Sequence, residues 1–166
     1  MSKPLLLVLS HEFPPLGGGA GRNCASLCRD LADRGARVEV LTQRAPGRSP
    51  DDFPFTVCSF WTPRRKRFRT DLFSMAVFIL RTIVATGRYR TSKPAAILSN
   101  MAIPAGVAGA LVSRMLGVPH AIWYHGADLH GNRAQGPGGV QRSLLRWIWK
   151  RPAVHCLSSE GMKALA

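Results

Sequence analysis

Short apolar segments alternate along this chain with longer segments in which apolar residues recur every three to four positions. The short segments span residues 5–9, 37–42, 55–60, 95–99, 120–124 and 153–157. Apolar runs of this length between Gly, Pro and polar residues predict buried β-strands, and the periodic segments predict helices. Because strands that alternate with helices form parallel sheets, we expect an α/β fold with a Rossmann-like, doubly wound, mostly parallel sheet of about six strands.

The length of 166 residues suits one domain. Helices are expected at about residues 25–32, 71–87, 104–116 and 141–150, with Gly35 ending the first and Ser159 capping a last one. Residues 162–166 continue a helical pattern without a cap, which favours a truncated or excised domain. We therefore expect residues 1–166 to be the N-terminal domain of a protein whose C-terminal domain is absent.

Neither a signal peptide nor a membrane span is expected. The apolar run at residues 5–9 leads directly into His11 and Glu12, without a small-residue cleavage site. The stretch 72–85 is interrupted by Arg81 and is shorter than the ~20 residues that a bilayer requires. The four cysteines form no Cys-x-x-Cys pair, which favours reduced thiols, a cytoplasmic location and no metal site.

The charge is strongly unbalanced, with 23 Lys and Arg against 9 Asp and Glu and a formal net charge of +14. Such a surface attracts polyanions: nucleic acid, anionic lipid headgroups or phosphorylated small molecules. The sequence contains neither a recognised nucleic-acid motif nor a run of aromatic stacking residues. We therefore expect no specific nucleic-acid partner.

Residues that follow the strands are the candidates for chemistry, because ligands on open parallel sheets bind at the carboxyl ends of the strands. These residues are 10–21, 42–44, 100–104, 125–130 and 158–160. The first of these segments contains Gly17, Gly18 and Gly19 and leads to Arg22 at the start of a helix. Glycine backbones and a helix N-terminus suit a phosphate group, so this loop is predicted to bind one.

The loop departs from the dinucleotide-binding fingerprint, because Arg22 occupies the position of its last glycine. The second strand also ends in Thr42, Gln43 and Arg44, without the acidic residue that holds a ribose. Arg44 would nevertheless tolerate a 2′-phosphate. A nucleotide- or NADP-binding oxidoreductase module and a non-catalytic basic module that binds membrane or nucleic acid therefore stay open as alternatives.

Three motifs resemble those of family 4 (group 1) glycosyltransferases, which have the GT-B fold. The first is Pro-Pro-x-Gly-Gly-Gly at residues 14–19, followed by Arg-Gly at 34–35 and a strand at 38–42. The second is His-Gly-x-Asp at residues 125–128, after the fifth strand, and the third is the strand followed by Ser159 and Glu160. Their order and spacing agree with the family across nearly the whole chain.

The resemblance implies an enzyme that transfers a sugar from a nucleotide-sugar donor to a sugar or lipid-linked acceptor, usually with retention and without a cofactor. Within such an enzyme this domain would hold the acceptor. By analogy, Gly18 and Gly19 lie near the donor diphosphate, His125 lies near the reacting groups as the catalytic candidate, and Asp128 orients its loop or binds acceptor. The resemblance also makes Gly17, Arg22, Ser159 and Glu160 substrate-binding candidates.

Two features depart from the family pattern. Ala36 stands where the family usually has His, at a position that supports the second strand. The acidic motif and the phosphate-binding Arg/Lys pair of the donor domain are absent from these 166 residues. We therefore expect the chain alone to lack efficient transferase activity.

A cationic run precedes the helix expected at residues 71–87. It comprises Arg64, Arg65, Lys66, Arg67 and Arg69. Beside a helix with Phe, Met and Ile, such a run suits an anionic membrane surface, at the inner face of the membrane in a cytoplasmic protein. A stripe of large apolar residues at helical spacing is more often part of a core. The sequence is therefore compatible with a membrane-binding helix and with a core helix that follows a solvated basic loop.

Overall fold

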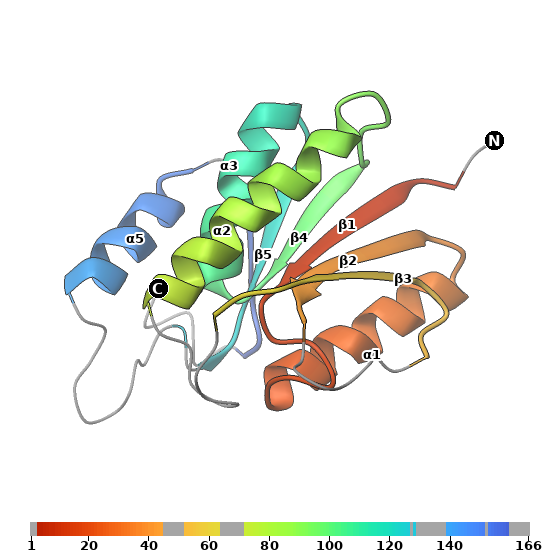
Figure 1. Cartoon of the computed structure of the whole chain (residues 1–166), viewed down its shortest axis with the longest axis horizontal. Helices are drawn as coiled ribbons and strands as arrows, with labels where there is room; N and C mark the ends of the chain where they lie inside the picture. Colours follow the sequence, from red (N-terminus) through yellow and green to blue (C-terminus); the bar gives the residue numbers. More distant parts are fainter. Residues whose placement is uncertain are drawn as a thin grey trace.

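The computed structural model describes residues 3–44, 52–63, 72–126, 128, 139–151 and 153–159. They form one six-stranded sheet in the order β3-β2-β1-β4-β5-β6, and every neighbouring pair of strands is parallel (Figure 1). The fold class predicted from the alternation of strands and helices is confirmed.

The elements follow the predicted order with small changes at their ends. The strands are β1 (Leu5–Ser10), β2 (Arg37–Gln43), β3 (Thr56–Phe60), β4 (Ala96–Asn100), β5 (His120–Tyr124) and β6 (Val154–Leu157). The helices are α1 (Gly19–Asp33), α2 (Leu72–Thr86), α3 (Val107–Leu116) and α5 (Gly139–Trp149). Short helical turns, η1 (Gly87–Tyr89) and η2 (Ala102–Gly106), precede β4 and α3. The helix predicted from residue 104 starts three residues later, because Ile103 has a non-helical backbone.

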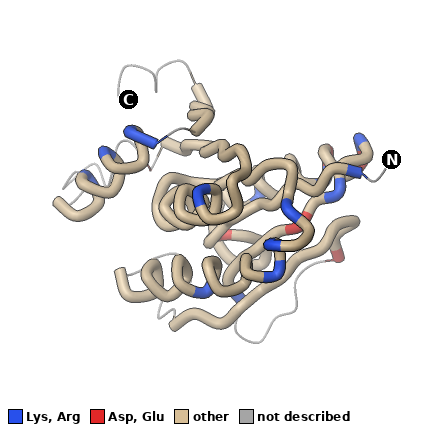
Figure 2. Tube along the Cα trace, turned by 90° about the horizontal axis from the view of Figure 1, so that it is seen from above, with Lys and Arg blue, Asp and Glu red and all other residues tan. Residues whose placement is uncertain are grey.

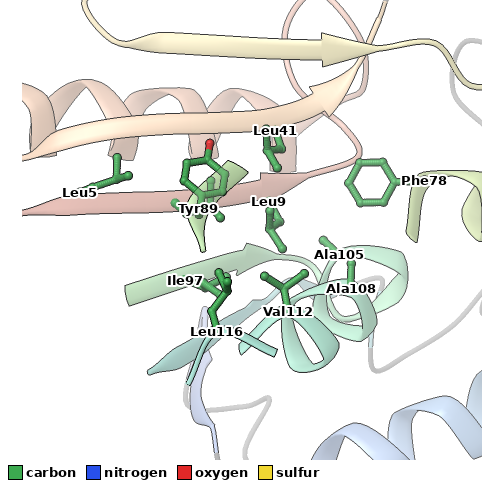
Figure 3. Packing of buried hydrophobic residues seen from close by; sticks show 11 residues of the cluster. Leu5, Leu9, Leu41, Phe78, Tyr89, Ile97, Ala105, Ala108, Val112 and Leu116 are labelled. Atoms are coloured by element: carbon green, nitrogen blue, oxygen red, sulfur yellow. The ribbon is translucent and has the colours of Figure 1, made fainter. Parts of the chain in front are cut away.

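Helices cover the two faces of the sheet unequally. α1 packs on one face over β1, β2 and β3, while α2, α3 and α5 lie on the other (Figure 1). Alternate residues of β1 enter the two cores, as expected for a strand buried on both faces. Leu7 and Leu9 join the core under α2 and α3 (Figure 3), and Val8 joins the core under α1.

The apolar residues of α2 only partly enter the core. Phe78 is fully buried, and Ile79 and Ile83 pack against the cores as a core helix requires. Leu72 and Phe73, by contrast, are 59% and 68% exposed. The preceding run from Arg64 to Arg69 lies outside the described residues.

Candidate functional site

The strand order places a topological switch point between β1 and β4. The chain leaves β1 into α1 on one face of the sheet, whereas it leaves β4 into η2 and α3 on the other. Ser10 and Asn100, the last residues of these two strands, are register partners. Asn100 is also the register partner of Trp123 in β5, two residues before His125. Ligands of open α/β sheets bind outside such a switch point.

Hydrogen bonds join His125 to the glycine loop across this point. His125 Nε2 lies 2.7 Å from Asn100 Oδ1, and Asn100 Nδ2 donates to Ser10 Oγ over 3.0 Å. Ser10 Oγ in turn donates to the carbonyl oxygen of Glu12 over 2.6 Å. Asn100 Nδ2 also lies 3.4 Å from the carbonyl oxygen of Ala20 in α1. Side chains of β1 and β4 thereby fix the imidazole, which follows β5, relative to the loop.

The same chain of hydrogen bonds selects the tautomer of His125. The amide nitrogen of Asn100 faces two acceptors, Ser10 Oγ and the Ala20 carbonyl oxygen, so its amide oxygen faces the imidazole and accepts a hydrogen bond from Nε2–H. Burial lowers the pKa of His125 below its usual value, so the ring is neutral near pH 7. A neutral ring with its proton on Nε2 keeps a lone pair on Nδ1, which is a hydrogen-bond acceptor.

The glycines of the loop divide into packed and open positions. Gly17 has a φ of +87°, and a Cβ there would lie 2.6 Å from Glu12 Cβ. A Cβ on Gly21 would lie 2.7 Å from the carbonyl oxygen of Glu12. Gly18 and Gly19, at the cap and first position of α1, have no atom within 4 Å of such a Cβ. The first turn of α1 carries no acidic residue and Gly18 offers no side-chain cap, which suits an anion.

Asp128 holds the loop that carries His125. Its Oδ2 accepts a hydrogen bond from the His125 backbone N–H over 2.8 Å, and its own N–H donates to the His125 carbonyl oxygen over 2.9 Å. Burial raises the pKa of Asp128 to about 6, and the charge of Glu12 adds to this rise, although the backbone N–H groups of His125 and Ala102 oppose it. The Asp128 carboxyl thus lies directly beside the backbone of His125.

Of the remaining predicted site residues, the structure describes Arg22 and Ser159. Arg22 lies in the first turn of α1 with an exposed side chain, and Ser159 is exposed after β6. The neighbouring Ser158 accepts from Trp123 Nε1 over 3.1 Å and donates to the Tyr124 carbonyl oxygen over 2.6 Å. Glu160 lies outside the described residues. Within the described part of the chain, no three His, Cys, Asp or Glu side chains gather as a metal-binding group.

Asn100 and Ser10 are the residues that sequence reasoning did not single out. Both belong to segments expected at the carboxyl edge, but neither lies in one of the three motifs. Each is a polar residue that ends an otherwise apolar strand and is fully buried. A buried polar residue at the end of a parallel strand, where ligands bind, is the signal that would have found them.

The parallel sheet and its helical crossovers define a Rossmann-like α/β domain. The glycosyl transferase 4-like domain family matches residues 18–166, and the chain therefore belongs to that family, as the three motifs predicted. No curated protein sequence matches the chain.

Solved structures agree on the fold. Sucrose-phosphate synthase from Thermosynechococcus elongatus superposes with a TM-score of 0.74 at 14% identity, over 98% of this chain and 44% of that one. A UDP-N-acetylglucosamine 2-epimerase gives a TM-score of 0.60 at 15% identity, over 99% and 44%. A putative UDP-N-acetylglucosamine 2-epimerase from Listeria monocytogenes gives 0.61 at 13%, over 99% and 42%. The fold thus matches the N-terminal half of GT-B enzymes, and the chain spans less than half the length of these structures.

Proposed function

We propose that this domain forms the acceptor-side half of a glycosyltransferase that transfers a sugar from a nucleotide-sugar donor to a sugar or lipid-linked acceptor. Family membership supports the transferase class. The observation that carries the proposal is the hydrogen-bond chain from His125 through Asn100 and Ser10 to the glycine loop. It joins an imidazole and an anion-binding helix end at one switch point.

The two halves of the site have complementary tasks in sugar transfer. A nucleoside diphosphate gains negative charge as the bond to the sugar breaks, and N–H groups at the start of α1 stabilise that charge. Gly18 and Gly19 leave room for a phosphate to approach these groups, because no atom lies where their side chains would be. His125 accepts a hydrogen bond from a sugar hydroxyl through Nδ1.

Asp128 is a positioning residue in this proposal. Its carboxylate and backbone hold the His125 turn closed through two hydrogen bonds. Arg22, Ser159 and Glu160 are assigned to substrate binding, and a second, C-terminal domain is assigned to the donor. No metal or cofactor takes part in the proposed reaction.

Turnover by the full-length protein with a panel of nucleotide sugars tests the proposal. Gly19→Ala places a methyl group where the phosphate would approach, and we expect KM for the donor to rise about tenfold without a change in melting temperature. Gly139→Ala, another open glycine at a helix start, is the matched control and leaves KM unchanged. Absence of turnover with every nucleotide sugar, or a Gly19→Ala variant with unchanged KM, contradicts the proposal.

A further inference from the structure

The helix α2 buries polar as well as apolar residues and exposes apolar residues on its outward side. Its buried positions follow one line along the helix and are Ser74, Phe78, Thr82 and Thr86. On its outward side Phe73, Leu80 and Val84 are 68%, 61% and 69% exposed. At 100° per residue these three side chains lie within a narrow stripe. The stripe contributes nothing to the core, although it consists of the side chains that a core would bury.

The helix layer that contains this stripe carries positive charge without acidic residues. From Leu72 to Gly126 and across α5 the sequence contains no Asp or Glu (Figure 2). Exposed basic residues occur on all three helices of the layer: Arg81 on α2, Arg114 on α3, and Arg142 and Arg146 on α5. Arg81 lies 100° around the helix from Leu80 and so flanks the stripe. The α1 layer differs, since it mixes Asp30 and Asp33 with its basic residues.

The layer also contains an open apolar groove between α3 and α5. Its volume is about 530 Å³, and Val107, Leu111, Leu144 and Trp147 line it. Val140 at the start of α5 is 60% exposed beside it. The outer surface of this layer therefore presents apolar side chains on all three helices, together with exposed arginines.

We propose that the surface formed by α2, α3 and α5 binds an anionic lipid bilayer, with Phe73, Leu80 and Val84 inserted among the acyl chains and the flanking arginines at the headgroups. Apolar side chains flanked by arginines suit an anionic bilayer, because its acyl chains are apolar and its headgroups are negatively charged. In the sequence, the run from Arg64 to Arg69 directly precedes the same helix. The inference does not depend on the proposed sugar transfer.

The bilayer would contact the outer side of α2 and would not be crossed by it. By length and composition, residues 72–89 would suffice to span a membrane. Phe78, however, is fully buried in the core, and Ser74 donates to the Pro63 carbonyl oxygen. Insertion of the whole helix would remove the crossover between β3 and β4, so the helix lies on the surface of the membrane.

Co-sedimentation of the full chain with vesicles tests this surface. We expect at least about tenfold tighter binding to vesicles of phosphatidylglycerol and phosphatidylcholine than to phosphatidylcholine alone, and loss of that preference in high salt. The double variant Leu80→Asn, Val84→Asn should weaken binding to the anionic vesicles about tenfold. Val154→Asn is the matched control, because Val154 is 64% exposed on β6 outside this layer, and it should bind like the wild type.

Three results would overturn the inference. They are equal binding to both kinds of vesicle, equal weakening by Val154→Asn, and a wild-type dimer in sedimentation velocity that the double variant dissociates. The dimer would show that a second copy of the chain covers the stripe. Melting temperatures of the variants verify that they are folded, and no substrate is present, so this result is separate from the outcome for sugar transfer.

Discussion

The two ends of β5 each carry a histidine that contacts the last residues of β4, yet the two have different surroundings. At the start of the strand, His120 is 4% exposed, and its Nε2 lies 2.9 Å from Ser99 Oγ. Just after the strand, His125 is partly exposed, and its Nε2 lies 2.7 Å from Asn100 Oδ1. Burial lowers the pKa of both rings. Buried polar contacts and a lowered pKa therefore do not by themselves distinguish a functional histidine.

The two histidines differ in what surrounds Ser99, the partner of His120, and Asn100, the partner of His125. Ser99 Oγ donates a hydrogen bond to the Ala105 carbonyl oxygen, and α3 packs so closely on Ser99 and His120 that only a glycine fits at position 109. The contact between the two side chains is therefore closed on the side of Gly109, although His120 also lines a pocket of about 500 Å³ between α3 and α5. Around His125 the turn is held by Asp128, and the chain of hydrogen bonds leads toward the α1 end that carries the open glycines. The histidine at the first end of the strand is packed under α3, and the histidine at the second end belongs to the proposed binding site.

Gly109→Ala should give the largest effect. The added Cβ would lie 2.2 Å from Ser99 Oγ and 2.4 Å from His120 Nε2. Because both atoms are buried and hydrogen-bonded, we expect a loss of about 3 kcal/mol in the free energy of unfolding, at the upper end of the range for overpacked cores. Urea denaturation measures it. Gly87→Ala is the control, because no atom lies within 4 Å of a Cβ at Gly87. Equal losses of stability in both variants would show that Ser99 and His120 do not pack tightly against Gly109.

His125→Ala should affect turnover and not folding. We expect kcat/KM of the full-length enzyme to fall about a hundredfold, which corresponds to about 2.7 kcal/mol of transition-state stabilisation. The free energy of unfolding should change by less than about 1 kcal/mol, since the ring is only partly buried. His120→Gln is the matched variant and should give the opposite pattern. Normal turnover by His125→Ala would remove that ring from the site.

Stability should depend on pH through His120. Burial, and secondarily the charge of His155, lowers the pKa of His120 from 6.5 to about 4. Between these values the unfolded chain binds more protons than the folded one, so the stability contributed is complete above pH 6.5 and is lost as pH falls toward 4. We expect about 2 kcal/mol over this range. Asp128 has the opposite sign, because its raised pKa of about 6 favours the folded state at low pH.

The difference in unfolding free energy between wild type and His120→Gln isolates this contribution. It should shrink as pH falls from 7 to 4.5, since the variant has no proton to gain at this position. A difference that stays constant with pH would mean that His120 titrates alike in the folded and unfolded chains.

The sheet could be predicted from the sequence because its strands are apolar runs with unambiguous ends. All six strands and their parallel arrangement followed from that pattern, and His125 was selected as a candidate because its motif resembles a known family. Strand order itself was not predicted, since pairing depends on contacts between residues distant in the chain. For the same reason the partnership of Asn100 with Ser10, 90 residues apart, was missed.

The exposure of apolar residues on the outer side of α2 was also not predicted. Its apolar residues recur on every side of the helix, so the periodicity of the sequence does not say which side faces the sheet. Ser74 and Thr86 are buried because their hydroxyls bond to the carbonyl oxygens of Pro63 and Ile83, and such partners become visible only in the folded chain.

Asn100→Asp should give the smallest effect and separates the two histidines most sharply. A carboxylate beside Nε2 stabilises the protonated ring, so the pKa of His125 should rise by about one unit, or about 1.4 kcal/mol. His120 faces Ser99 and should keep its pKa of about 4. Proton NMR titration measures both rings, with His125→Ala identifying the resonance of His125.

A protonated ring donates hydrogen bonds from both nitrogens, so its Nδ1 no longer accepts a hydrogen bond from a sugar hydroxyl. In the full-length enzyme the acidic limb of the pH–rate profile should therefore move to higher pH by the same unit, with the activity above that limb retained in part. If the pKa of His125 rises and the limb does not move, the neutral ring is not the active form. If the pKa of His120 rises equally, the two ends of β5 are not electrostatically separate, and the division between packing and binding fails.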